Sequence, residues 1–322
     1  MTGYQGPSFR LVETISGRDF ERRRKRVRAD RPFLVKGGVE DWPAWQKWSF
    51  DHFADLARDA RRPVTAVFQD GLVEQGLTRE PVRSPLEPYV RQLSREASTA
   101  RASRGPDVGL CKDRRLAGLG PGDQFVLDWS WLQSFRPNRV YLAQWDIMRQ
   151  FPALRNDLRM TRMWRHRRNY PFIWIGPANT ITGLHTDYPD NWFCQFRGEK
   201  EFVLFSPDDD PFLSPSPKYD FGAVLSRVDV MRVQEGGAEA DVFAKARGIY
   251  ARVQPGDALF VPRNTWHFVV SLEPAISLSV FGLTIADMVM QGPRRIGLDF
   301  LHNLGLYRRG NCTCHGAGAG RY

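Results

Sequence analysis

Three residues of this sequence are well suited to bind a metal ion. His185 and Asp187 are separated by one threonine, and His267 lies further along the chain. Side chains alternate along a strand, so His185 and Asp187 would point to the same face of an extended segment. Two imidazoles and one carboxylate on one side of a metal ion form the facial triad of non-haem Fe(II) oxygenases, which leaves positions open for other ligands. The three residues therefore predict an iron site.

The segments that must position these residues are expected to be strands. Residues 172–176 precede the triplet and residues 191–196 follow it, and both are rich in aromatic and apolar side chains. His267 comes after a Gly-Asp turn signal and an apolar run in residues 256–262. A His-x-Asp triplet also arises by chance, and a histidine satisfied within a sheet is the alternative interpretation. Zinc is disfavoured, because its catalytic sites generally use three histidines, or two histidines and a glutamate.

Lys200 is a cation within an otherwise apolar run. Arg197-Gly198 predicts a hairpin turn, and beyond it Lys200, Phe202 and Leu204 would share one strand face. Lys200 is then either an edge-strand charge or a buried cation, and a buried cation needs an anionic partner. Lysine is scarce here, with 7 Lys against 39 Arg. A lysine between large apolar side chains, near a metal, suits the distal carboxylate of a 2-oxo acid.

Seven short strings between residues 139 and 282 occur in the order and at the spacing of a known family. They are residues 174–176, 182–187, 191–193, 198–200, 204–207, 255–257 and 260–267. On these strings the chain resembles the JmjC/cupin-8 family of Fe(II)- and 2-oxoglutarate-dependent oxygenases. It is most similar to the small hydroxylase branch, which includes the asparaginyl hydroxylase that inhibits hypoxia-inducible factor and the tRNA wybutosine hydroxylase.

The resemblance implies roles for the residues already singled out. His185, Asp187 and His267 would bind the iron. Lys200 would pair with the C5 carboxylate of 2-oxoglutarate, and Thr182 would donate a hydrogen bond to the same group. With iron, this cosubstrate and O2, the family hydroxylates a C–H bond and converts 2-oxoglutarate to succinate.

Further pocket residues follow from the same resemblance. Tyr141 would reach the C5 carboxylate, Asn191 would support the C1 end of the cosubstrate, and Trp174 would wall the pocket. The last strand, at residues 276–281, lacks the asparagine that some relatives carry near iron. Ser277 or Ser279 would take its place.

The fold class implied is mainly β with flanking helices, around a double-stranded β-helix (jelly-roll or cupin) core. We expect residues 1–135 to form an N-terminal α/β flank packing on the core, and residues 136–283 the catalytic barrel. Residues 284–307 would be a helical segment and residues 308–322 a flexible tail. Ser49 predicts an N-cap that opens a short helix.

Two loops, a C-terminal helix and a tail are also predicted. Residues 101–122 predict a mobile loop, and residues 207–221 a loop that is either a lid or a passive connection. A helix at residues 285–306 would follow the barrel, and in related enzymes such helices often form a homodimer. The tail residues Cys312, Cys314 and His315 are too few for a closed zinc site.

The substrate is the least determined feature. A peptide or protein side chain is expected, with RNA or a small natural product as alternative substrates, and a non-catalytic metal-binding cupin as the alternative class. The net charge is +10 and Arg155, Arg159 and Arg162 would form one basic helix face. Nucleic-acid binding is nevertheless disfavoured, because the excess of arginine over lysine indicates a compositional bias.

No membrane association is expected. No apolar run approaches the roughly eighteen residues of a membrane span, and the first residues lack a signal-peptide pattern. The chain holds 4 cysteines, too few and too scattered for a disulfide framework. A cytoplasmic location is therefore predicted.

Overall fold

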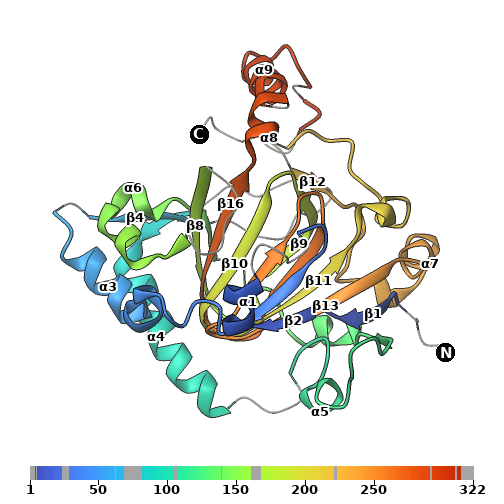
Figure 1. Cartoon of the computed structure of the whole chain (residues 1–322), viewed down its shortest axis with the longest axis horizontal. Coiled ribbons are helices and arrows are strands. Elements are labelled where there is room, and N and C mark those ends of the chain that lie inside the picture. The colour runs from blue at the N-terminus through green and yellow to red at the C-terminus, as the bar shows by residue number, and fades with distance from the viewer. Residues whose placement is uncertain are drawn as a thin grey trace.

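The computed structural model shows two facing β-sheets with helices on their outer sides (Figure 1). A third sheet consists of two strands, β4 (Thr65–Phe68) and β5 (Val82–Pro85). The residues described are 4, 6–23, 29–61, 63–68, 82–103, 108–138, 140–160, 168–220, 223–290, 292–308 and 310–312.

The first sheet has seven strands, and all neighbours are antiparallel except the parallel pair β1 and β13. In spatial order they are β12 (Ala223–Leu225), β9 (Ile181–Asp187), β15 (Trp266–Ser271), β11 (Lys200–Phe205), β13 (Arg247–Val253), β1 (Ser8–Leu11) and β6 (Phe125–Val126).

The second sheet also has seven strands, with one parallel pair, β2 and β3. In spatial order they are β2 (Glu13–Ser16), β3 (Phe33–Lys36), β14 (Ala258–Val261), β10 (Asp190–Arg197), β16 (Ala275–Leu283), β8 (Arg168–Gly176) and β7 (Leu142–Trp145).

Successive strands alternate between the two sheets, from β8 to β11 and again from β13 to β16. This alternation is the winding of a double-stranded β-helix, so the predicted fold class is confirmed. The hairpin predicted at Arg197-Gly198 is wrong, because this turn connects β10 in the second sheet to β11 in the first. Gly198 has a φ of +70°, and a Cβ there would lie 2.2 Å from the carbonyl oxygen of Pro274, so the crossing requires glycine.

Three apolar clusters fill the fold. The cluster between the sheets includes Phe193, Phe202 and Val269, and the others cover the outer faces of the second and first sheets. Because both faces of each sheet are covered, β11, β14 and β15 are buried along their whole length.

Helices supply the outer layers. Those that border the second sheet are α1 (Gly17–Arg23), α2 (Pro43–Lys47), α3 (Phe50–Arg58), α4 (Leu86–Ser103), α6 (Ile147–Gln150) and η2 (Pro152–Asp157). The first sheet is bordered by α5 (Asp113–Leu116), η1 (Trp129–Ser134), η4 (Pro207–Phe212), η5 (Val233–Glu235) and α7 (Ala238–Phe243). The N-cap prediction is confirmed, because Ser49 Oγ accepts a hydrogen bond of 3.1 Å from the His52 amide.

The N-terminal 135 residues contribute strands to both large sheets. Of these strands, β1 and β6 extend the first sheet, whereas β2 and β3 extend the second. The predicted boundary at residue 135, between an N-terminal flank and the catalytic barrel, stays a prediction.

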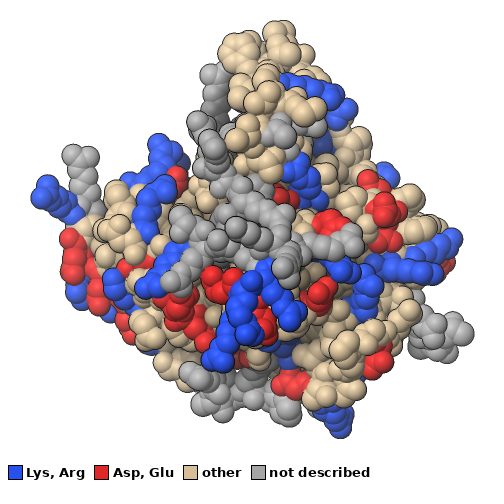
Figure 2. Space-filling view, viewed as in Figure 1, with Lys and Arg blue, Asp and Glu red and all other residues tan. Residues whose placement is uncertain are grey.

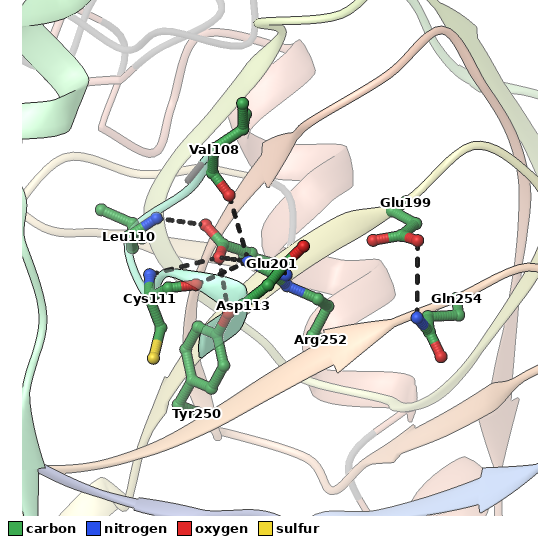
Figure 3. A network of polar contacts seen from close by, with 9 residues as sticks. All are labelled: Val108, Leu110, Cys111, Asp113, Glu199, Glu201, Tyr250, Arg252 and Gln254. Carbon is green, nitrogen blue, oxygen red and sulfur yellow. Dashed lines mark hydrogen bonds and ion pairs between the residues drawn. The ribbon is translucent and has the colours of Figure 1, made fainter. Parts of the chain in front are cut away.

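The segment at residues 101–122 is partly built into the fold. Helix α4 continues to Ser103, and residues 108–113 lie on the outer face of the first sheet, where hydrogen bonds hold them to Glu201 and Arg252 (Figure 3). The mobile-loop prediction is therefore wrong for residues 108–113. Residues 104–107 lie outside the described part.

The predicted basic helix face is also wrong. Helix η2 ends at Asp157, and Leu158 is extended, so Arg155 and Arg159 do not share one helix. Asp157 is buried and accepts hydrogen bonds from Trp48 Nε1 at 3.1 Å and Lys47 Nζ at 2.6 Å, a tertiary contact that helical periodicity does not contain. Arg162 lies outside the described residues.

The C-terminal segment projects from the sheets (Figure 1). Its described residues form α8 (Ile285–Met290) and α9 (Gly292–Asn303), and residue 291 between them lies outside the described part. Beyond them, the amide of Tyr219 donates to the carbonyl of Asn311, and Cys312 is buried, so the expected tail begins with packed residues. Cys314 and His315 lie outside the described residues, as does Phe221 at the end of the predicted 207–221 loop. Within the described chain, no helix is long and apolar enough to span a membrane.

Candidate metal centre

The three predicted metal ligands converge inside the barrel. His185 and Asp187 lie on β9, and His267 lies directly opposite His185 on the adjacent strand β15. The Nε2 atoms of His185 and His267 are 3.8 Å and 3.7 Å from Asp187 Oδ2, and one donor atom from each residue lies within 4.8 Å of the others. The structure thus confirms that these side chains come together, with two nitrogens and one oxygen facing a common point.

Main-chain carbonyls orient both imidazoles. His185 Nδ1 donates to the Gly183 carbonyl at 2.7 Å, and His267 Nδ1 donates to the Thr265 carbonyl at 3.0 Å. A carbonyl only accepts, so each ring carries a proton on Nδ1, and Nε2 is the nitrogen that faces Asp187. Burial lowers the pKa of His267 to about 4, which keeps this imidazole neutral.

A β-bulge places Thr182 on the same face as His185. On β9, His185 pairs with His267 and Thr182 pairs with Val269, so two residues on β9 lie opposite one residue on β15 between these pairs. In a regular strand, residues three apart point to opposite faces, and the extra residue corrects this. The bulge also supplies the Gly183 carbonyl that holds His185.

Lys200 is a buried cation rather than an edge charge. It lies on β11 in the middle of the first sheet and is 2% exposed. Its Nζ donates to Tyr141 Oη at 2.9 Å and lies 5.2 Å and 5.3 Å from the rings of Tyr141 and Phe193. Among the described residues no carboxylate pairs with it, and burial lowers its pKa to about 7. An ammonium group held in this way needs an anionic ligand.

Tyr141 reaches Lys200 across a glycine. A Cβ on Gly176 of β8 would lie 2.5 Å from the Tyr141 ring, so the absence of a side chain there makes room for the tyrosine. The ring of Trp174 lies 5.7 Å from that of Tyr141. Tyr141 therefore contacts Lys200 directly, and Trp174 packs next to Tyr141.

Asn191 and Trp174 meet at Ser279. Trp174 Nε1 donates to Ser279 Oγ at 3.0 Å, and Asn191 Nδ2 donates to the same atom at 3.3 Å. Asn191 Oδ1 is buried without a hydrogen-bond partner among the described residues. Ser277 bonds instead to Gln195 at 2.7 Å. The two serines left open by the sequence are thereby distinguished, and Ser279 occupies this corner.

Several contributors to the site were not predicted. The carbonyls of Gly183 and Thr265 orient the histidines, and the amide of Asn264 donates to the Asp187 carbonyl at 2.7 Å. Asn264 has a φ of +57° in the turn before β15, a conformation that asparagine tolerates well. Residue types do not reveal which main-chain carbonyls or amides will bind a side chain. Of these contributors, only Asn264, in the turn before His267, could have been predicted from its residue type.

The residues present fit Fe(II) and 2-oxoglutarate. Two imidazoles and a carboxylate are the donor set of the facial triad. The buried ammonium of Lys200 fits a carboxylate, and Asn191 Oδ1, which is buried without a partner among the described residues, offers a second polar position inside the barrel. The fold and these donors define a JmjC-type cupin.

The comparison with known families agrees with this class. A family model described as "Cupin-like domain" matches residues 18–281, and the chain belongs to this family. The match includes all three candidate ligands and reaches well into the N-terminal region.

Individual relatives match different shares of the chain. Jumonji C domain-containing protein 5 of Drosophila melanogaster is 32% identical over 148 residues, which are 44% of this chain and 36% of that protein. HSPB1-associated protein 1 of Rattus norvegicus is 39% identical over 104 residues, 32% of this chain and 21% of that protein. tRNA wybutosine-synthesizing protein 5 of Gallus gallus is 26% identical over 274 residues, 84% of this chain and 76% of that protein.

Proposed function

We propose that the chain is an Fe(II)- and 2-oxoglutarate-dependent dioxygenase that hydroxylates a C–H bond of a peptide or protein side chain. One observation carries the proposal: the His185–Asp187–His267 donors and the buried Lys200 ammonium lie in one barrel, on three neighbouring strands. An iron ion alone would need only the three donors. A 2-oxo acid that chelates the iron and carries a second carboxylate also needs the Lys200 ammonium.

Each residue has a distinct task in this reaction. His185, Asp187 and His267 would hold Fe(II), which with 2-oxoglutarate and O2 supplies the oxidising chemistry and yields succinate. Lys200 would fix the C5 carboxylate.

Other groups would orient the cosubstrate and keep the pocket dry. Thr182 and Tyr141 would assist Lys200, and Asn191, held by Ser279, would orient the C1 end. Trp174 and Phe193 would exclude water.

A tRNA substrate is the second candidate. The observation in its favour is that the wybutosine relative matches the chain over 84% of its length. Against it, Arg159 lies 3.5 Å from Asp41, and positive and negative side chains are interspersed on the face seen in Figure 2. A single-sign surface would suit a phosphate backbone better.

The C-terminal helices are proposed to contact a second copy of the chain. Eight large apolar side chains in this segment are exposed, and the projecting tip in Figure 2 is mostly uncharged. They are Ile285, Val289, Met290, Ile296, Phe300, Leu301, Leu304 and Leu306. An exposed apolar face of this size indicates an interaction surface. Sedimentation should show a dimer that Phe300→Asp converts to monomer.

The proposed activity is tested by anaerobic titration of the apo-protein with Fe(II) and then 2-oxoglutarate. A weak visible metal-to-ligand charge-transfer band is expected, because a 2-oxo acid that chelates Fe(II) produces one. Asp187→Ala should lose the band, whereas Asp241→Ala, at an exposed acid on α7, should keep it. Absence of the band at full iron content would refute the cosubstrate assignment and favour a non-catalytic cupin.

A further inference from the structure

A cleft of about 620 Å³ lies between the sheets, away from the metal centre. It opens where the chain leaves the first sheet: β1 pairs with β13 only as far as Tyr250, and after Val12 the chain continues as β2 in the second sheet. Of the described strands, none pairs with the outer side of β13 beyond this point. The two sheets therefore diverge here, and β1, β2 and β13 are seen near one another in the lower right part of Figure 1.

The floor and wall of the cleft are apolar. Val12, Leu34 and Ala251 form the floor and belong to the cluster between the sheets. Leu116 and Leu119, at and after the end of α5, form the facing wall. A cleft of several hundred Å³ with an apolar floor and wall, bordered by polar and charged side chains, is suited to a small molecule that has both apolar and charged parts.

The charged side chains of the lining are unbalanced. Four cations border the cleft, Arg10, Arg31, Lys36 and Arg252, against one acid, Glu13. Acids pair with three of these cations, so the charge open to a ligand depends on the cation that has no acidic partner.

One of these cations is available to a ligand. Arg31 lies 3.5 Å from Glu13, Lys36 lies 2.7 Å from Asp257, and Arg252 is held by the buried Glu201. Arg10 is exposed, and among the described residues no acid pairs with it. It lies on β1 opposite Ile249, which also lines the cleft, so its guanidinium shares a face with the apolar lining.

We propose that this cleft binds a long-chain fatty carboxylate, with the alkyl chain between the floor and the Leu116–Leu119 wall and the carboxylate at Arg10. A ligand with a linear apolar body and one terminal anion matches both the lining and the charge. The site is separate from the metal centre, because the edge-to-face rings of Phe202 and Phe193 lie between Ala251 and the Lys200 ammonium. The proposal does not depend on the dioxygenase function.

The test is a fluorescence titration of the full chain with dansyl-labelled undecanoate, followed by displacement with hexadecanoate below its micelle concentration. Saturable binding with an enhanced, blue-shifted emission is expected. Arg10→Glu should weaken binding about five- to tenfold, the effect of reversing one exposed charge. Arg95→Glu, at an exposed arginine on α4, should leave it unchanged.

Two further variants locate the alkyl chain. Leu119→Asp places a charge in the apolar wall and should abolish binding with an unchanged circular dichroism spectrum, whereas Phe300→Asp in α9 should have no effect. The proposal is overturned by three results: no saturable binding, binding lost in Phe300→Asp but kept in Leu119→Asp, or binding to phosphatidylglycerol vesicles without binding to the monomeric acid. The second result would place the ligand on the C-terminal helices, and the third would identify a lipid headgroup.

Discussion

Lys200 and Glu201 are neighbours on β11, and both are buried, yet their surroundings differ completely. Glu201 faces the outer side, where it accepts hydrogen bonds from the Leu110 amide at 2.7 Å, Tyr250 Oη at 2.5 Å and Arg252 at 2.9 Å (Figure 3). Lys200 faces the barrel interior, and its hydrogen-bond partner among the described residues is the neutral Tyr141. A buried charge with a complete set of partners holds a structure together, whereas one without a counter-ion is suited to receive a ligand.

On the outer side, Glu201 and Arg252 form the centre of a polar network that we call the clamp. Glu201 and Arg252 are directly opposite each other on β11 and β13, and Arg252 also pairs with Asp113 and donates to the carbonyls of Val108 and Cys111. Gly109 fits only because it has no side chain, since a Cβ there would lie 2.4 Å from Glu201 Oε1. This network holds residues 108–113 on the sheet.

The largest expected effect comes from breaking the clamp. Glu201→Ala leaves Arg252 without its main buried counter-ion and Tyr250 Oη without its acceptor, so the free energy of unfolding should fall by about 3–5 kcal/mol. Chemical denaturation measures it. Glu199→Ala is the matched control, because this side chain is half-exposed and its hydrogen bond from Gln254 is long, at 3.4 Å, so the loss should stay below about 1 kcal/mol. Equal losses in both variants would contradict the comparison.

Lys200→Met should produce the opposite pattern. The methionine fills a similar volume and removes a cation with no counter-ion, so the stability of the apo-protein should change by less than about 1 kcal/mol. The affinity for 2-oxoglutarate should fall about 30-fold or more, while Fe(II) binding is retained. Isothermal titration of both ligands measures the difference. Unchanged 2-oxoglutarate affinity would remove Lys200 from the cosubstrate site.

The lowered pKa of Lys200 predicts a pH dependence. The carboxylate of the cosubstrate binds the protonated amine, and the pKa of the free amine is about 7. Affinity should therefore be constant below pH 7 and fall as pH rises above it, by up to about tenfold per unit, until the pKa of the complex is reached. Lys200→Arg keeps its charge and should bind without this dependence. An identical slope in both proteins would assign the titration to another group.

The smallest effect should separate the two serines of β16. Ser279→Ala removes the common acceptor of Trp174 and Asn191, so the KM for 2-oxoglutarate should rise about three- to tenfold. Ser277→Ala removes only the bond to Gln195 and should lower stability without changing that KM. A rise in KM for Ser277→Ala alone would reverse the assignment of this pocket corner.

The local sequence patterns predicted much of the site and of the fold. The His185–Asp187 pair follows from the two-residue period of a strand, and the cap at Ser49 follows from local hydrogen bonding. These features depend on residues near one another in the chain, and the structure confirms them.

Patterns that depend on distant residues were predicted wrongly or left open. Spacing indicated a helix through Arg155 and Arg159, but Asp157 is buried against Trp48 and Lys47, more than one hundred positions earlier, and the helix ends there. The Arg197-Gly198 turn was recognised as a turn, but the sheet of the strand that follows it depends on pairing with β13 and β15.

The sequence by itself therefore determined the donor types, their strand spacing and the fold family, because each of these is written in short strings of residues. Only the tertiary structure decided that a bulge turns Thr182 to the face of His185, that Ser279 rather than Ser277 meets Asn191, and that Glu201 is a clamp while Lys200 is not. Two adjacent ionisable residues look alike in a sequence. They differ because successive side chains on a strand point to opposite faces of the sheet. The residues that contact them on each face come from distant parts of the chain.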